Sequence, residues 1–278
     1  MSDTVCVLGP GAVGGALGVR MALAGEDVVC VARPAAAAAI AEHGLTLVTD
    51  DGERSVRLDA REALDDPVDL LLVTVKAPGL GDAISRIGSE PALVLPLLNG
   101  LEHMDVLRAR FGKVVAATIG RFEGYKESAT RIVQQTPGIV NVAAPEAPPQ
   151  LERSGIATRA GGGEKDVLWE KLARQGPIAV LTSATGRTVG ELRREPRLRL
   201  AVEEACAVAA ADGAATTFDE QWEIIESLPE WATSSTARDV AARLPSELDA
   251  IGGAIVRAGR RLGVATPTLE EALASCRA

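Results

Sequence analysis

Residues 4–33 read TVCVLGPGAVGGALGVRMALAGEDVVCVAR. The apolar, β-branched run at 4–8 is typical of a buried strand, and a glycine-rich turn at 9–15 follows it directly. A helical run at 16–24 then stops at Gly25, and a second apolar strand follows at 27–31. This order of strand, glycine turn, helix and strand is the context in which a G-x-G-x-x-G pattern indicates dinucleotide binding.

Each glycine of the pattern has a physical task. Gly9 permits the tight turn, Gly11 lets a pyrophosphate approach the backbone, and Gly14 lets helix and strand pack closely. The helix N-terminus offers free N–H groups and a partial positive charge to the phosphates. The alternative is an ordinary strand-to-helix turn. We predict cofactor contacts from the whole turn: Gly9, Pro10, Gly11, Ala12, Val13 and Gly14.

The residue after the second strand indicates which dinucleotide binds. An acidic side chain there would accept hydrogen bonds from the adenine ribose of NAD, whereas this chain has Arg33. A guanidinium pairs well with phosphate oxygens, so Arg33 favours NADP (NADPH). The alternative is a solvated surface arginine.

Composition limits the class of protein. The 278 residues suffice for two domains, and the hydrophobic (47%) and charged (24%) fractions are ordinary for a soluble enzyme. A net charge of −9 argues against nucleic acid or anionic membrane as the main partner. The first apolar run is too short for a signal peptide, and no run approaches the ~20 apolar residues that span a bilayer. We expect a cytoplasmic protein.

The four cysteines are scattered and form no C-x-x-C motif. Cys6 and Cys30 fall inside predicted buried strands, where a free cysteine behaves as a small apolar residue. We therefore predict neither a metal site nor a disulfide framework.

The first part of the chain continues the alternation of strands and helices. We predict a helix at 34–43, a hairpin of strands 45–48 and 55–58, strands at 70–75 and 93–98, and a helix at 79–87. Ligands of a doubly wound sheet bind at the carboxyl ends of its strands. The residues expected to converge there on one crevice are Gly9, Arg33, Lys76 and Asn99.

Strands at 114–119 and 131–142 are expected to finish that sheet, in antiparallel or mixed pairing. The pattern becomes helical near Glu164. We predict helices at 166–184, 197–212, 219–228, 231–244, 247–262 and 268–276. The predicted fold is α/β, with an N-terminal Rossmann-type dinucleotide-binding domain at 1–164 and an all-α C-terminal domain at 165–278.

The order of motifs resembles the ketopantoate reductase (2-dehydropantoate 2-reductase) family along essentially the whole chain. The stretches that carry this resemblance are the glycine turn, Arg33, Val73-Thr74-Val75-Lys76, Asn99-Gly100, Trp169-Glu170-Lys171-Leu172-Ala173, Gly190-Glu191-Leu192, Ser234-Ser235 and Ser246-Glu247-Leu248-Asp249.

The resemblance implies NADPH-dependent reduction of a small-molecule 2-oxo acid or ketone to the hydroxy compound. Lys171 matches the proton donor, and Glu247 an acidic residue near the nicotinamide ribose and the reacting centre. Lys76 and Asn99 match cofactor contacts, with Asn99 also touching substrate. The family's substrate-binding positions fall on Asn99, Lys171, Gln175 and Ser235.

The chemistry requires a group such as Lys171. Hydride arriving at a ketone carbon leaves a developing alkoxide, which needs positive charge and a proton together. A partly desolvated lysine beside a cationic cofactor has a lowered pKa and supplies both.

The chain departs from the family around that lysine. The family usually has Asn four and eight residues after the Lys, where this chain has Gln175 and Ala179, and a further Asn is here Ala232. Pro177 is expected to kink the helix. Because paired polar groups reject wrong substrates, we expect altered specificity, toward a larger, less polar or simply different 2-oxo acid or ketone, with ketopantoate itself left open.

Each assigned residue has a structural alternative. Lys171 is otherwise a solvated helix lysine paired with Asp166 or Glu170, and Glu247 and Ser235 are otherwise helix-terminal residues. Lys76 is otherwise solvated and Asn99-Gly100 only a turn. The alternative functions are a 6-phosphogluconate or β-hydroxyacid type dehydrogenase and a non-catalytic NADP-binding sensor. A homodimer is left open.

Overall fold

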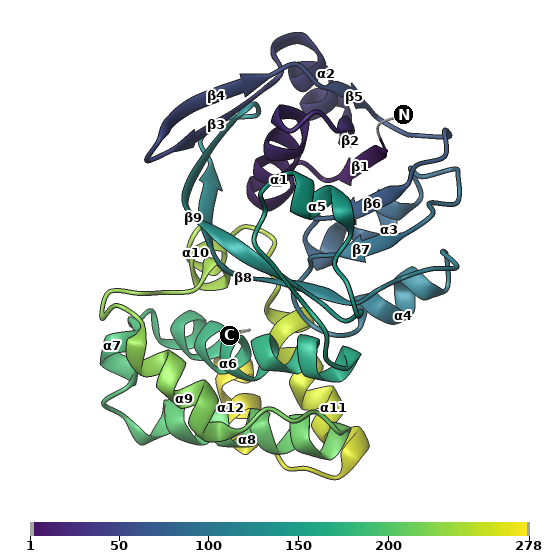
Figure 1. Cartoon of the computed structure of the whole chain (residues 1–278). Coiled ribbons are helices and arrows are strands. Elements are labelled where there is room, and N and C mark those ends of the chain that lie inside the picture. The colour runs from purple at the N-terminus through teal and green to yellow at the C-terminus, as the bar shows by residue number, and fades with distance from the viewer. Residues whose placement is uncertain (1–2, 277–278) are drawn as a thin grey trace. The chain divides into compact units, whose positions relative to one another are not determined.

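The computed structural model describes residues 3–276, which divide into two compact units. The first contains residues 3–98 and 103–164, and the second contains residues 99–102 and 165–276 (Figure 1). The short segment 99–102 therefore belongs with the helices that follow it much later in the sequence.

The first unit contains a parallel five-stranded sheet. Its strand order is β5-β2-β1-β6-β7, and every neighbouring pair is parallel. The strands are β1 (Thr4–Leu8), β2 (Asp27–Val31), β5 (Asp59–Arg61), β6 (Leu70–Val73) and β7 (Val94–Pro96). The helical elements connected to this sheet are α1 (Ala12–Leu23), α2 (Pro34–His43), η1 (Ala77–Gly79), α3 (Leu80–Ile84) and α4 (His103–Arg108). The predicted Rossmann-type fold is confirmed.

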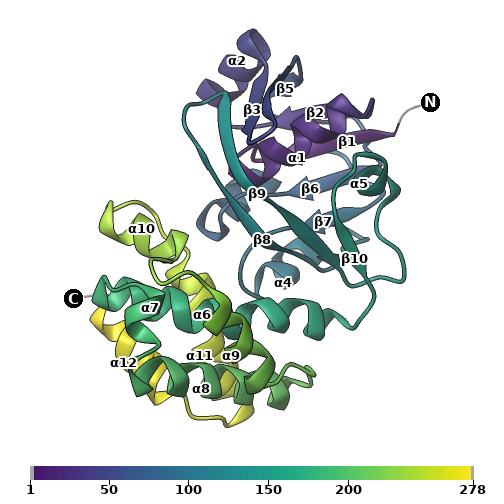
Figure 2. The ribbon, with the colours of Figure 1, turned by 60° about the vertical axis from the view of Figure 1, so that its left-hand side comes forward.

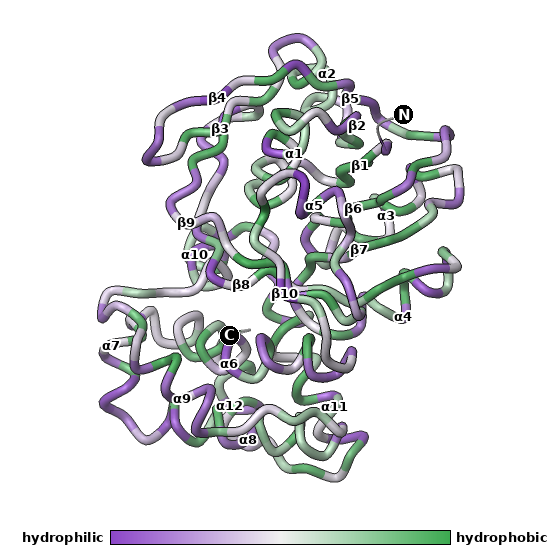
Figure 3. The backbone as a smooth tube through the Cα atoms, in the orientation of Figure 1, coloured by the Kyte–Doolittle hydropathy of each residue, from purple (hydrophilic) through white to green (hydrophobic). Residues whose placement is uncertain are grey.

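This sheet is buried on both faces, as expected of a parallel sheet. Along β1, Val5 and Val7 pack with Leu17 of α1, whereas Cys6 and Leu8 belong to a separate cluster on the other face. Figure 3 shows β1 and β7 as mainly hydrophobic. Burial raises the pKa of the Cys30 thiol to about 12, so this cysteine is a neutral core residue.

A second sheet, also in the first unit, surrounds the long strand β9. β9 pairs antiparallel with β8 and parallel with β3 and β10 (Figure 2). β3 forms a hairpin with β4 (Figure 1). These strands are β3 (Leu45–Thr49), β4 (Gly52–Val56), β8 (Ala117–Lys126), β9 (Arg131–Val142) and β10 (Thr158–Ala160), with the helix α5 (Pro149–Arg153) nearby in the chain.

The prediction that residues 114–119 and 131–142 complete the parallel sheet holds only at Val114, which forms a parallel bridge with Val94 of β7. It is wrong for β8 and β9, which belong to the second sheet. β9 alternates buried residues, such as Ile132 and Val140, with more exposed ones. This is the pattern of a sheet with one covered face rather than a strand buried on both sides. Its buried face covers α1, because Ile132 contacts Gly15.

The second unit is helical, as predicted. Its elements are α6 (Glu164–Thr185), α7 (Val189–Leu192), α8 (Pro196–Asp212), α9 (Phe218–Ser227), α10 (Ser235–Ala241), η2 (Asp249–Gly253), α11 (Ala254–Leu262) and α12 (Pro267–Ser275). Two predictions needed correction. The helix expected at 231–244 is limited to α10, because Ser234 caps it by accepting from the Ala237 amide (2.9 Å). The helix expected at 247–262 begins with a π-helical turn, η2. No helix in residues 3–276 is long and apolar enough to cross a membrane.

Trp169 ties α6 to the end of α8. Its indole is fully buried, and its Nε1 donates to Asp212 Oδ2 (2.9 Å). Asp212 also accepts from Lys165 Nζ through Oδ1 (3.2 Å). One carboxylate therefore satisfies the single donor of the largest buried side chain in this unit.

Replacing Asp212 by Ala removes the acceptor of that indole. An unsatisfied buried donor costs about 1–3 kcal/mol, so we expect unfolding stability to fall by that amount. Urea denaturation followed by tryptophan fluorescence measures it. The matched control is Glu223→Ala, an exposed acid on α9, which should stay within about 0.5 kcal/mol of wild type. Equal midpoints for the two variants would contradict the assigned role of Asp212.

Candidate active site

The glycine turn after β1 is shaped by two close approaches. Gly9 has φ +85°, in the left-handed region that favours glycine, and its amide donates to the Val31 carbonyl (2.9 Å). A Cβ on Gly14 would lie 2.1 Å from Thr74 Oγ1. Both positions therefore require glycine for this backbone path.

Thr74, at the end of β6, holds the turn from the neighbouring strand. Its hydroxyl donates to the Gly9 carbonyl (2.8 Å) and lies 3.1 Å from the Leu8 carbonyl. Thr74 belongs to the motif Val73-Thr74-Val75-Lys76, from which no role was predicted for it. Its position two residues before Lys76 was the available signal.

The start of α1 can accept an anion. Gly11 is the N-cap residue, and no side chain caps the helix, so the first-turn amides of Ala12, Val13 and Gly14 have no intrahelical acceptor. A Cβ built on Gly11 meets nothing closer than the Gly9 carbonyl oxygen, at 3.8 Å. Space and donors are therefore both present beside Gly11, which suits a phosphate group.

Arg33 and Lys76 share the sheet edge with this turn. Leu8 pairs with Val31 on β2 and with Val73 on β6, so the carboxyl ends of the three strands are neighbours. Arg33 is the N-cap residue of α2 and Lys76 that of η1, and both are exposed. Asn99 belongs to the second unit, so its convergence with these residues stays a prediction.

In the second unit, three side chains form a hydrogen-bonded chain. Lys171 Nζ on α6 donates to Asn99 Oδ1 (2.7 Å), and Asn99 Nδ2 donates to Glu247 Oε2 (3.0 Å). Because an ammonium only donates and a carboxylate only accepts, the two ends fix the orientation of the amide between them. Glu247 is buried, at 7% exposure.

The environment of Lys171 changes its proton affinity. Burial lowers the pKa of Lys171 to about 8; the nearby Arg174 also lowers it, and the Glu247 carboxylate opposes both by raising it. The solvated alternative does not describe this lysine, since its amine is hydrogen-bonded to Asn99, while Asp166 Oδ1 accepts from the Ala215 amide (2.8 Å). The ammonium is thus desolvated and oriented.

Asn99 is held by close packing of its segment. Gly100 has φ +91°, and a Cβ there would lie 2.1 Å from the Ala250 carbonyl oxygen in η2. Leu101 packs against the helical core. The Asn99-Gly100 pair is therefore a turn that carries a side chain into a defined position, and its contacts with cofactor and substrate stay a prediction.

Arg257 on α11 joins the two segments that carry Asn99 and Glu247. Its guanidinium binds Glu102 through two bonds of 2.7 Å, and it donates to the Asp249 side chain and carbonyl, both at 3.0 Å. Arg257 was not predicted from the sequence. Nothing in its local pattern separates it from a solvated helix arginine.

The expected substrate positions differ in their surroundings. Gln175 Oε1 is buried and has no hydrogen-bond partner in residues 3–276. Ala179 is buried, and α6 continues past Pro177 to Thr185. Ser235 is exposed at the start of α10, where the capping role belongs instead to Ser234, whose hydroxyl also bonds Thr182 (2.9 Å). Within the described part of the chain, no cluster of three or more His, Cys, Asp or Glu side chains could hold a metal ion.

Comparisons with known proteins cover both units. The family profile "Ketopantoate reductase PanE/ApbA" matches residues 5–147, and its C-terminal counterpart matches residues 165–278. A 2-dehydropantoate 2-reductase of Mycobacterium tuberculosis is 28% identical over 96% of this chain and 94% of its own length. One from Pyrobaculum aerophilum is 30% identical over 73% of this chain and 74% of its own length.

Solved structures agree with the sequence comparisons. The crystal structure of a PanE/ApbA family ketopantoate reductase from Ralstonia eutropha JMP134 superimposes with a TM-score of 0.87 at 28% identity, covering 99% of this chain and 97% of the other. The resemblance inferred from the motifs is thereby confirmed. This chain belongs to the ketopantoate reductase family of NAD(P)-dependent oxidoreductases, which act on 2-oxo acids.

Proposed function

We propose that the protein reduces a 2-oxo acid to the 2-hydroxy acid with NADPH, and that Lys171 donates the proton. The observation that carries this proposal is the desolvated Lys171 ammonium, hydrogen-bonded to Asn99 with its pKa lowered to about 8. A general acid is most effective when its pKa lies near the working pH.

The first unit would hold the cofactor, with the glycine turn and α1 amides on the pyrophosphate. Support comes from the open space beside Gly11 and the uncapped helix start. Arg33 would pair with a 2′-phosphate, which favours NADPH over NADH. Lys76 would add positive charge at the same edge. When bound, the nicotinamide supplies the hydride.

The second unit would supply the proton. As the substrate carbonyl becomes an alkoxide, Lys171 Nζ stabilises the charge on that oxygen and passes a proton to it. Asn99 orients the ammonium through its Oδ1, and Glu247 fixes Asn99 from the other side. Glu247 also raises the pKa of Lys171, which opposes burial and keeps more of the amine protonated.

The substrate would be less polar than the family's usual one around the position of Ala179. Ala179 and Ala232 offer no side-chain hydrogen bonds, and Gln175 keeps one amide whose Oε1 is buried without a partner in the described chain. A substrate donor satisfying Oε1 would remove the cost of that orphaned acceptor. Ser235 would bind the substrate carboxylate.

Turnover distinguishes this proposal from a non-catalytic NADP-binding protein. The assay follows NADPH oxidation with ketopantoate and with 2-oxo acids that have apolar side chains. Turnover of any of these acids supports the reductase, whereas NADPH binding with no turnover on the whole panel supports the sensor.

Lys171→Met should reduce kcat by at least ~100-fold, because the general acid is lost. NADPH affinity should change little. Steady-state kinetics and nucleotide titration measure the two effects. The matched control is Lys165→Met on the same helix, whose ammonium binds Asp212 instead, and it should keep its kcat. A Lys171→Met protein with near wild-type kcat would rule out the assigned acid.

The rate of ketone reduction should fall as the pH rises through about 8, because the protonated form of Lys171 is the active one. An ordinary lysine would hold its proton to about pH 10.4. The reverse oxidation should show the opposite pH dependence, so its rate should rise over the same pH range. The measurement is kcat against pH in both directions. A reduction rate that stays flat to pH 10 would contradict the lowered pKa.

Gln175→Leu should weaken discrimination between ketopantoate and its analogue lacking the terminal hydroxyl group. If the amide bonds that hydroxyl, wild type prefers the hydroxylated acid and the variant loses the preference, by roughly tenfold in the ratio of kcat/KM values. An unchanged ratio would show that Gln175 does not contact this group.

A further inference from the structure

The ammonium of Lys126 lies beside the glycine turn. Lys126 is the last residue of β8, and its Nζ donates to the Pro10 carbonyl (3.3 Å). Neither the motifs nor the family resemblance assigned it a role. Its side chain remains accessible to solvent, so a ligand can reach it.

Packing of β8 and β9 on α1 fixes this position. Lys126 pairs with Ile132 of β9, and Ile132 packs so closely on α1 that a Cβ at Gly15 would meet its Cδ1 at 2.2 Å. Two residues further along β9, Gln134 Oε1 accepts from Arg20 Nη2 of α1 (2.7 Å). The partner of Lys126 on β9 and a second residue two positions along therefore hold the hairpin against the helix that follows the glycine turn.

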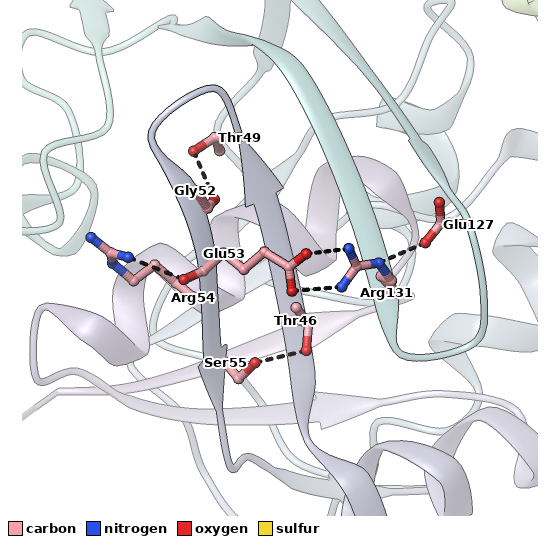
Figure 4. A network of polar contacts seen from close by, with 8 residues as sticks. All are labelled: Thr46, Thr49, Gly52, Glu53, Arg54, Ser55, Glu127 and Arg131. Atoms are coloured by element: carbon pink, nitrogen blue, oxygen red, sulfur yellow. Dashed lines mark hydrogen bonds and ion pairs between the residues drawn. The ribbon is translucent and has the colours of Figure 1, made fainter.

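The carboxylate of Glu127, the residue after Lys126, already has a hydrogen-bond partner. Glu127 Oε2 accepts from Arg131 Nε (2.6 Å), and Arg131 also binds Glu53 of β4, with one bond of 2.9 Å (Figure 4). Figure 4 shows Arg131 between the two carboxylates, which ties the hairpin end to the edge of the second sheet.

No carboxylate of residues 3–276 lies within ion-pair distance of Lys126, and its ammonium donates to a neutral carbonyl, that of Pro10. Partial burial lowers the pKa of Lys126, while the Cys30 side chain raises it. Cys30 is no counter-ion at neutral pH, since burial raises the pKa of its thiol to about 12. A partly desolvated cation without an anion is thus fixed at the turn of a chain whose net charge is −9.

We propose that Lys126 binds the 2′-phosphate of NADPH, opposite Arg33, and so contributes to the choice of NADPH over NADH. This inference rests on the proposed function. Lys126 approaches the turn at Pro10, and the preceding residue, Gly9, donates to the carbonyl of Val31, two residues before Arg33 at the end of β2. In this fold, residues that follow β2 recognise the group at the ribose 2′ position, whereas the pyrophosphate binds at the helix N-terminus. The position of Lys126 therefore fits the 2′-phosphate better than the pyrophosphate.

The test compares nucleotides that differ only in this phosphate. NADPH and NADH are titrated into wild type, Lys126→Met and Lys126→Arg by fluorescence, and adenosine 2′,5′-bisphosphate and 5′-AMP are titrated by calorimetry. The matched control is Lys113→Met, an exposed lysine of the same unit with no hydrogen bond or ion pair to its side chain in the described chain.

Lys126→Met should raise the Kd for NADPH and the bisphosphate by about tenfold or more, the usual effect of losing one charge-assisted hydrogen bond. The Kd for NADH and 5′-AMP should stay within about twofold. Lys126→Arg should retain most of the NADPH affinity. Added salt should narrow the difference between wild type and Lys126→Met, because screening weakens exposed charge pairs.

Two results would overturn the inference while leaving the reductase proposal in place. Equal losses for NADPH and NADH would mean that Lys126 acts on the pyrophosphate or supports the turn. Unchanged affinity for all four ligands would mean that it takes no part in binding. A wild-type chain that binds neither dinucleotide would overturn the proposed function and this inference with it. Circular dichroism verifies that each variant is folded.

Discussion

The hydrogen bond from Lys171 to Asn99 is the interaction on which the proposed chemistry depends. An amine at this depth loses hydration, which favours its neutral form and pulls its pKa down. The amide oxygen replaces part of that hydration, and the Glu247 carboxylate opposes the loss of the proton. Burial alone would leave a neutral base, whereas full solvation would leave an ammonium too weakly acidic to give up its proton. The three side chains together hold the group between those limits.

In the first unit, the backbone of the glycine turn between β1 and α1 packs closely against its neighbours, and the space in front of the turn stays open. Gly14 lies against Thr74, and Gly9 is held between the ends of β2 and β6. Of the three motif glycines, Gly11 alone has no such close neighbour, and it is the one expected to face a ligand. Because the Thr74 hydroxyl also holds the Gly9 carbonyl, the turn is anchored by a side chain as well as by the sheet.

Local signals predicted much of the fold, and long-range contacts decided the rest. The bounds of β1, β2 and α2 match the prediction because apolar runs, a glycine turn and an N1 proline all agree there. The sheet membership of β8 and β9 depended on distant partners, so it was mispredicted, and β5, of three residues, was too short to show a period. Lys171 and Glu247 were predicted through the family resemblance alone, whereas Asn99 was also predicted from its place at the carboxyl end of a strand. No role was predicted for Thr74, Arg257 and Lys126, because polar residues usually lie at the surface. Their contacts with distant parts of the chain become visible only in the folded structure.

The four residues 99–102 give the molecule an interlaced architecture. The chain leaves the α/β unit at Leu98, contributes Asn99 and Glu102 to the helical unit, and returns at His103 before leaving again after Glu164. A fragment made of residues 165–278 would retain Lys171, Glu247 and Arg257. It would lack Asn99, whose amide bonds both Lys171 and Glu247, and Glu102, whose carboxylate binds Arg257. The hydrogen-bonded chain of Lys171, Asn99 and Glu247 is therefore a property of the uninterrupted polypeptide. Exchanging the helical unit between relatives would have to carry residues 99–102 along with the helices.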